Sequence, residues 1–554
     1  MNATKIQPFF KIFTLLVVLA YFSLQFMNIF AFSDSFEEIS MRNIDDAAMQ
    51  GAIAEWHQAI FRMDLSQVFF KFDYAYGWIF WATYGVMSLP AAVLLKIYPD
   101  VQIFERAIII SNRFTTFVIS ILVILAIRKF SGKILQGVRF KQKENSDNSK
   151  IIINFLTILV LMVPSLGYWM GRVQPNMLTL LLLTLGLNLI IEVITKAPLN
   201  LSSSRLLQLG IMCVSASVAS KPVTIYWLPI ILLIAIRYLR LHPTKNQIHL
   251  KSSFLLKTCI FQLVSILVFL SPYLLVSPWT TVTKLLSIFK YFSNTTTDFY
   301  TNPALIVSRF NNGFMDPLLG QIGFLFLLTL VLLNFFKTKK TGIFYLYIYL
   351  VSIGLLFSVV GPTYPQLIAS YTFPLLLFVI VILVLALSSE KSNATNVVAS
   401  ILLLISMIFN FIVQLDSDGK SRNLAINTYL IDSRSAENAL KKMDISKIRE
   451  NVQLDVDPII VQSYRTPTVH SSMYSPTRVI YIFDNWETLA NLSDADWVVL
   501  PRIEFLKNPF FRNNDKKIED VKNFDKLSVG SKFNFGKFAC QIAYFTDYTI
   551  IMRC

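Results

Sequence analysis

Charged residues are scarce in this chain: only 15% of its 554 residues are Asp, Glu, Lys or Arg, whereas 54% are hydrophobic. Soluble domains carry about 25% charged residues, so the composition excludes an ordinary soluble protein. The mean hydropathy is +0.55, and many apolar runs reach the roughly 20 residues that cross a bilayer as a helix. The sequence therefore predicts an α-helical polytopic membrane protein.

Several motifs are missing as well. The chain has no phosphate loop, dinucleotide fingerprint, zinc-ligand spacing or nucleophile elbow, which excludes ATP-driven pumps and most soluble enzyme classes. The net charge is +16, but the cations cluster at the ends of apolar runs, as the positive-inside rule expects. No basic stripe interleaved with aromatics stands in a soluble segment. We therefore expect membrane lipids, and no nucleic acid, as partners.

Cysteine is rare, with four residues in the whole chain. Cys213 and Cys259 lie in apolar runs and are expected to be small core residues. Cys540 and Cys554 lie in the polar tail, where a disulfide would close a hairpin if the tail is outside the cytosol. The sequence leaves that pairing open.

The charges also suggest a topology. The first apolar stretch, about 12–32, follows lysines and precedes acidic residues, so the amino terminus is expected inside. Its apolar core is too long for a typical signal peptide, which favours an anchor. An outer loop follows over 33–106, in which 47–62 predicts an amphipathic helix on the membrane surface.

Residues 74–95 are apolar but are not expected to cross. A crossing there would place the basic cluster between Arg128 and Lys143 on the outside, against the positive-inside rule. We expect a half-embedded helix broken at Gly77, Gly85 and Pro90 and packed against the bundle.

About eleven spans result, the first near the amino terminus and the others at 107–127, 151–170, 175–195, 206–220, 222–239, 258–277, 317–336, 341–360, 366–389 and 396–414.

The tail changes character near Asp416. Strand-like runs appear at Pro458–Tyr464, Arg478–Phe483 and Trp497–Leu500, with helical or loop stretches between them. We expect a small α/β domain over 415–554 on the extracytoplasmic side, following a transmembrane catalytic domain over 1–414.

The candidate catalytic residues are Asp45 and Asp46, just beyond the first apolar segment. Neighbouring carboxylates repel, which tends to raise one pKa, so one would serve as a general base. The other would orient the substrate or bind a metal. The alternative is structural, because Asp near a first helical turn satisfies free backbone N–H groups.

Three cations are predicted on the same outer face: Arg172, Lys221 and Arg309. Together with the carboxylates they suit a polar headgroup that carries phosphate, which Arg binds in a bidentate manner. Interfacial snorkelling is the alternative for each.

Other residues of the outer loop are weaker candidates for substrate binding. Tyr74 and Tyr76 would stack on a sugar or line a lipid groove, although an aromatic belt explains them equally well. His57 would add a ligand, although a lone His is more often structural.

The order of these motifs resembles the multi-span glycosyltransferases of the GT-C superfamily, which include protein O-mannosyltransferases and aminoarabinose transferases. The run Ile44–Met49 is similar to their first acidic run, and Phe72–Trp81 to the segment after it, without the usual His-Pro-Pro. The stretch from Arg106 to Gly132 resembles their next span with its basic end. Gly171–Asn176 resembles their second outer loop, where Asn176 replaces a frequent acidic residue.

This resemblance implies inverting transfer of a sugar from a polyprenyl-phosphate donor to a hydroxyl of a lipid, glycan or protein acceptor. Asp45 would be the base, matching the first acidic position of the family. No cofactor is required by the sequence, and a divalent cation stays open. We expect a bacterial inner membrane with a periplasmic active site, because no retention signal ends the chain.

Two alternatives come from other functional classes. A lipid-linked saccharide transporter or flippase would need charges inside the spans or broken paired helices, and the spans look nearly free of buried charge. A non-enzymatic membrane assembly protein would use the tail as its binding module.

Overall fold

The computed structural model has two compact units. One comprises Met1–Ala31, Ala52–Val93 and Ile110–Leu415, and the other Phe32–Gly51, Leu94–Ile109 and Asp416–Cys554. The structure describes residues 3–30, 44–69, 76–97, 101–139, 146–196, 201–229, 248–283, 286, 303–338, 341–360, 365–388, 398–413, 459–463, 478–482, 497–501, 528–535, 538–545 and 549–553.

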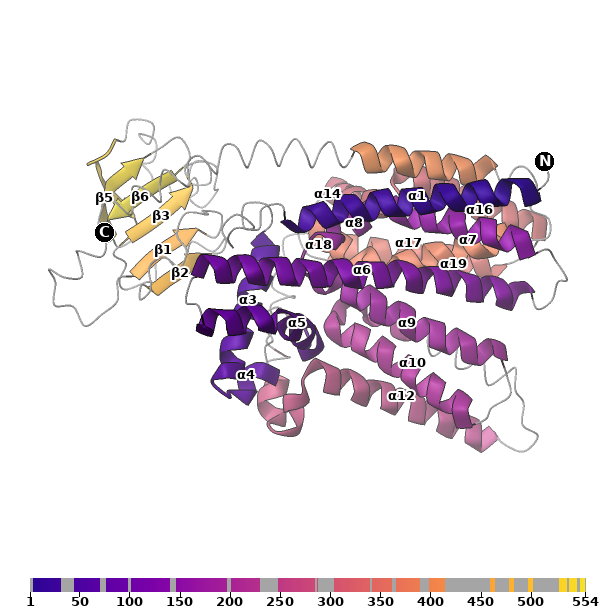
Figure 1. Ribbon diagram of the computed structural model, residues 1–554, viewed down its shortest axis with the longest axis horizontal. Coiled ribbons are helices and arrows are strands. Elements are labelled where there is room, and N and C mark those ends of the chain that lie inside the picture. The colour runs from indigo at the N-terminus through magenta and orange to yellow at the C-terminus, as the bar shows by residue number, and fades with distance from the viewer. Residues whose placement is uncertain are drawn as a thin grey trace. The chain divides into compact units, whose positions relative to one another are not determined.

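The first part of the chain is helical from its amino terminus. Its elements are α1 (Ala3–Phe30), α3 (Ile44–Phe61), α4 (Leu65–Phe69), α5 (Trp78–Ile97), α6 (Val101–Arg139), α7 (Ser146–Leu161), α8 (Pro164–Met170), α9 (Pro175–Lys196) and α10 (Leu201–Ser220). In Figure 1, α1 runs beside α7, and α9 runs beside α10, in agreement with their contacts. These neighbours bury the apolar sides of helices that the sequence marks as spans.

The remaining helices complete the bundle. They are η1 (Pro222–Trp227), α12 (Ile248–Leu270), η2 (Pro272–Leu275), α14 (Pro303–Phe310), η3 (Asn311–Met315), α15 (Asp316–Leu318), α16 (Gln321–Thr338), α17 (Thr341–Val360), α18 (Pro365–Thr372), η4 (Phe373–Leu375), α19 (Leu376–Leu387) and the unlabelled helix Val398–Val413. Helices α16, α17 and α19 contact one another, and α10 packs on α12.

Five of the described helices are long and apolar enough to cross a membrane, and up to seven if each of two bent pairs counts as one span. The bent pairs are α7 with α8, at 64°, and Ile306–Leu318 with Gln321–Phe336, at 74°. A polytopic membrane protein is therefore supported. The number of eleven spans stays a prediction, and most of the expected span 222–239 lies outside the described residues.

Helix α6 is longer than the expected span 107–127. Its 39 residues correspond to about 58 Å at 1.5 Å per residue, roughly twice the thickness of a bilayer hydrocarbon core. The basic residues near its carboxyl end, which include Arg128 and Lys133, thus belong to the same continuous helix.

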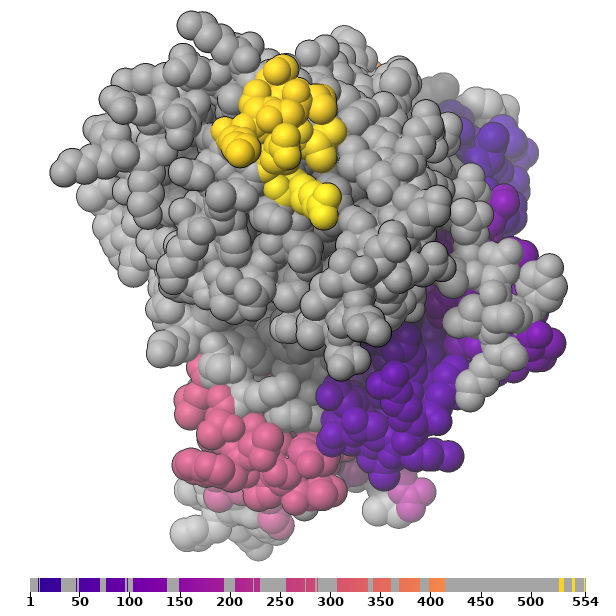
Figure 2. Space-filling model, turned by 90° about the vertical axis from the view of Figure 1, so that its left-hand side faces the viewer, coloured from indigo at the N-terminus to yellow at the C-terminus, as the bar shows by residue number. Residues whose placement is uncertain are grey.

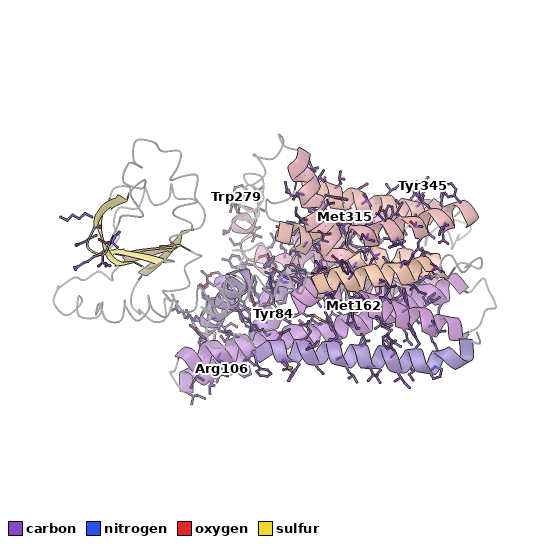
Figure 3. All side chains as sticks on the ribbon, turned by 90° about the horizontal axis from the view of Figure 1, so that it is seen from above. Tyr84, Arg106, Met162, Trp279, Met315 and Tyr345 are labelled. Atoms are coloured by element: carbon purple, nitrogen blue, oxygen red, sulfur yellow. The ribbon has the colours of Figure 1, made fainter. Side chains whose placement is uncertain are left out.

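The interior and exterior of the bundle differ in the expected way (Figure 3). Tyr84 is fully buried, and its hydroxyl lies 3.0 Å from Thr116 Oγ1. Tyr345 points outward and is 66% exposed. Helix α4 contacts η2, and Trp279, just beyond η2, is 76% exposed. The pink part of the chain, which includes the segment around η2, lies at the surface in Figure 2.

A helix is present where 47–62 predicts one, as α3, while its position on a membrane surface stays a prediction. The breaks expected in 74–95 are corrected. Helix α5 is continuous through Gly85 and Pro90, and Gly77 precedes it rather than breaking it. Gly85 instead allows close packing, because a Cβ there would lie 2.3 Å from the Trp56 ring. The glycine is thus explained by helix-to-helix contact and not by a kink.

A second correction concerns buried charge. Arg113 lies in the middle of α6 and is only 1% exposed. Its Nη1 donates to the carbonyl oxygen of Ile29 at 3.4 Å, near the end of α1. A cation at a helix carboxyl end is favourable, so this buried charge has a structural role.

The described part of the tail forms one six-stranded sheet in the order β2-β1-β3-β6-β5-β4. Strands β1 (Ile459–Ser463), β2 (Arg478–Ile482) and β3 (Trp497–Pro501) are parallel and occupy the three runs expected as strands. Strands β4 (Lys532–Phe535), β5 (Phe538–Phe545) and β6 (Thr549–Arg553) add antiparallel pairs. The expected helices and Cys554 lie outside the described residues, so the pairing of Cys540 with Cys554 stays open.

Candidate functional site

The first element of the candidate site is Lys221, placed by a helix end. Pro222 follows it and opens η1, and because a proline disfavours helical geometry in the residue before it, α10 stops at Ser220. Lys221 accordingly has φ −148° and ψ 89°. Its backbone still donates to Ser217 O at 3.1 Å, which fixes the start of its side chain.

The Lys221 ammonium is buried, with only 1% of the residue exposed. Nζ donates to Asn176 Oδ1, to Ser370 Oγ and, at 2.5 Å, to Ser370 O. It also lies 5.2 Å from the centre of the Tyr371 ring. Among the described residues these partners are neutral, so three donors are satisfied while the charge is not compensated by a carboxylate.

Hydrogen bonds from two tyrosine hydroxyls connect the helices that hold this ammonium. Tyr226 in η1 donates its hydroxyl to Tyr371 O at 2.9 Å, and Tyr349 in α17 donates to Tyr226 O at 2.6 Å. These bonds tie η1, α17 and α18 together. Ser370 and Lys221 are thereby brought together from positions 149 residues apart in the chain.

Arg172 lies in the short link between α8 and α9 and is 5% exposed. Its Cζ is 3.3 Å from the centre of the Tyr168 ring, a close cation–π contact. Asn176, four residues on, donates from Nδ2 to Gln174 Oε1 at 3.2 Å, and Ser370 Oγ donates to Asn176 Oδ1 at 3.1 Å. Asn176 thus connects the start of α9 to Lys221 and Ser370, four residues after Arg172 in the chain.

Arg309 approaches the same neighbourhood from another part of the sequence. It is 1% exposed and lies near the end of α14, immediately before the π-helical turn η3. That turn contacts α18, the helix that carries Ser370. Wide turns of this kind are frequent at functional sites.

Tyr76 also lies close to the end of α10. Gly77 N donates to Ala219 O at 3.0 Å, two residues before Lys221. A Cβ at Gly77 would lie 2.6 Å from Phe269 O and 2.8 Å from Ala219 O, so this close approach needs glycine. The Tyr76 ring contacts Phe80, with 5.5 Å between centroids, while Tyr74 lies outside the described residues.

His57 has structural contacts. It is 1% exposed, and its Nε2 lies 2.8 Å from Gly85 O and 3.2 Å from Ser88 Oγ. Burial lowers the pKa of His57, partly opposed by the bond to Gly85. These contacts clamp α3 to α5, and a role in substrate binding stays a prediction.

Asp45 and Asp46 are the second and third residues of α3. Asp46 is 1% exposed, whereas the side chain of Asp45 lies outside the described part. Their place in a first helical turn also suits the structural alternative. The catalytic role of both therefore stays a prediction.

Two members of the site escaped the sequence reasoning. In the sequence, Asn176 stands where related proteins often have an acidic residue, so no role was predicted for it. In the structure its Oδ1 accepts a hydrogen bond from Lys221 Nζ. Ser370 lies in an expected span and carries no local signal. The part of the chain that the structure describes shows no group of three or more His, Cys, Asp or Glu able to hold a metal.

Comparison by sequence finds no matching family model and no matching curated protein. Comparison by structure finds ArnT from Cupriavidus metallidurans bound to undecaprenyl phosphate, with TM-score 0.50 and 10% identity, covering 98% of this chain and 97% of that one. The apo state of the same protein matches at TM-score 0.46, 12% identity and the same coverage.

An oligosaccharyltransferase from Archaeoglobus fulgidus matches less well. Its TM-score is 0.40 at 11% identity, over 76% of this chain and 60% of that one. The likeness to undecaprenyl-phosphate-bound ArnT extends over nearly the whole of both chains. At 10% identity this likeness shows a shared fold, and that fold agrees with the one that the sequence resemblance implied.

Proposed function

We propose that this protein is an inverting glycosyltransferase that moves a sugar from a polyprenyl-phosphate donor to an acceptor hydroxyl. One observation carries the proposal: the buried Lys221 ammonium is held by the neutral oxygens of Ser370 and of Asn176 at the start of α9. A buried charge is costly unless it is paired. An anionic ligand would supply the missing negative charge.

The fold supports a phosphate-bearing lipid as that ligand. The solved structure with the same fold holds undecaprenyl phosphate, and this chain has apolar helices beside its buried cations. A lipid-linked donor would enter from the bilayer, with its phosphate at Lys221, Arg172 and Arg309. Phosphate oxygens would join or replace the oxygens of Asn176 and Ser370 at the ammonium.

The reaction then needs one base and one stabilised leaving group. The Asp45 carboxylate takes the proton of the acceptor hydroxyl, whose oxygen attacks the anomeric carbon from the face opposite the phosphate. The bond from that carbon to the phosphate oxygen breaks, and its electron pair leaves with the polyprenyl phosphate. Fixed cations stabilise the added negative charge as it develops. Asp46 would orient the acceptor or a divalent ion.

The wider assignment follows the same proposal. Residues 1–414 would form the catalytic membrane domain and 415–554 an extracytoplasmic domain, with the reaction on the periplasmic side of a bacterial inner membrane. Tyr74, Tyr76 and His57 would line the approach of the sugar or acceptor. The choice of sugar and acceptor is left to the assay.

The test is an assay of the purified full-length protein with a panel of polyprenyl-phosphate monosaccharides. Asp45→Asn should abolish transfer, and Arg172→Ala should raise the KM for the donor without changing acceptor preference. Asp64→Asn and Arg62→Ala are matched controls, because they repeat the same substitutions at a half-buried and an exposed residue outside the proposed site, and each should keep near-normal activity. An active Asp45→Asn variant would rule out the assigned base.

A transporter is the second candidate, and the two bent helix pairs favour it, because transporters commonly use broken helices. Proteoliposomes containing a fluorescent polyprenyl-phosphate sugar separate the two functions. Translocation without any product from the donor panel would favour the transporter, whereas product formation would favour the transferase.

A further inference from the structure

A basic cavity lies at the other end of the helical unit. It has a volume of about 500 Å³ and is lined by residues of α1, α6 and α7. Because α7 and α8 form one bent pair, the beginning of α7 and the Arg172 link beyond α8 are at opposite ends of that pair. The cavity is therefore separate from the Lys221 site. Its lining carries four cations, Lys11, Arg128, Lys129 and Lys150.

No carboxylate is among the described residues that line the cavity. Like charges gathered around one hollow repel each other and raise the local concentration of anions. The cavity thus attracts negative charge.

The lining is also partly rigid and partly apolar. Arg128 Nη2 donates to Asn154 Oδ1 at 2.9 Å, and Asn154 is 3% exposed, so a buried side chain orients the guanidinium. Leu125, 56% exposed, and Ile153 complete the wall. A fixed guanidinium, flexible ammonium groups and an apolar wall together fit an amphiphile with a phosphate headgroup.

The positive-inside rule explains why cations lie at this end of the helices, but it does not explain why four of them line one cavity. Arg205 and Lys257 belong to the same predicted inner side and are exposed, yet they do not line the cavity. The same cations spread over the inner side would orient the helices in the membrane equally well. The arrangement around one hollow needs a further explanation.

We propose that this cavity binds the phosphate headgroup of an anionic phospholipid, with the acyl chains leaving along Leu125 and Ile153. The site is independent of the proposed sugar transfer. It would hold the α1, α6 and α7 ends together by bridging their cations.

The test compares thermal unfolding of the full-length protein in detergent after addition of phosphatidylglycerol, phosphatidylcholine or inorganic phosphate. Phosphatidylglycerol should raise Tm by about 3 °C or more, as expected for a ligand that binds only the folded state, and the other two should not. The variant Lys11→Gln/Lys129→Gln should lose at least half of that shift. Both lysines are exposed, so the fold should survive.

The matched control is Arg205→Gln/Lys257→Gln, which removes the same charge from the same predicted side and should keep the full shift. Equal loss in both variants, or an equal effect of phosphatidylcholine, would overturn the proposal. Inorganic phosphate reproducing the shift would make this a free-anion site and overturn the lipid assignment.

Native mass spectrometry of the unmodified protein provides a readout that needs no variant. Preferential retention of phosphatidylglycerol over phosphatidylcholine at low stoichiometry is expected, and equal retention would contradict the site.

Discussion

The two ends of the helical unit hold their cations in opposite ways. At one end, the Lys221 ammonium is buried and donates hydrogen bonds to neutral oxygens of Asn176 and Ser370. At the other end, Arg128 and the lysines around it are exposed around a hollow. A buried ion is costly and is retained where chemistry needs a preorganised charge. Exposed cations cost little, because water still solvates them.

The largest expected effect tests this difference directly. Lys221→Met should lower sugar transfer by about 10²-fold or more, because a fixed group that stabilises developing charge is lost. Lys129→Met, at the exposed end, should leave the rate within about twofold, since it lies away from the reaction. Initial rates with saturating acceptor measure both. Equal losses would mean that burial does not distinguish the two ends.

Alanine substitutions at two glycines, one at each end, compare how tightly the two ends are packed. Gly77→Ala should destabilise the protein by about 1–3 kcal/mol, as overpacking does, because the new Cβ would meet two backbone oxygens within 2.8 Å. Gly132→Ala, beside the cavity, meets only Ile153 Cδ1 at 3.6 Å and should stabilise α6 by about 0.5–1 kcal/mol. Thermal unfolding in detergent measures both, and a stable Gly77→Ala variant would contradict the close approach.

The smallest expected effect concerns pH. Burial lowers the pKa of His57, so the neutral ring is the folded form. Its contribution to stability is complete above the unfolded pKa of about 6.5 and is lost as the pH falls below that value. The Tm of the protein should therefore drop between pH 7.5 and 5.5, and His57→Gln should drop less. Parallel curves for the two proteins would show that another group controls the change.

Much of the architecture could be read along the chain. Apolar runs predict helices, and alternating patterns predict the strands now seen as β1, β2 and β3. The helix predicted at 47–62 is also found, as α3. These features are local, because hydrophobic period and turn residues fix them within a few residues.

Some expectations failed because neighbours override local signals. Gly85 suggested a break in 74–95, but it lies in a continuous helix where Trp56 packs against it. Arg113 is a buried charge inside a span, made acceptable by the carbonyl of Ile29. Neither partner is near in sequence.

The sequence by itself determined a helical membrane protein with cations at particular helix ends, because composition, proline positions and charge bias act locally. Only the tertiary structure decided that Lys221 meets Asn176 and Ser370. It also decided that Lys11, Arg128 and Lys150 share one hollow. The physical reason is that such contacts join residues from separate helices, and their geometry follows from how whole helices pack rather than from any local pattern.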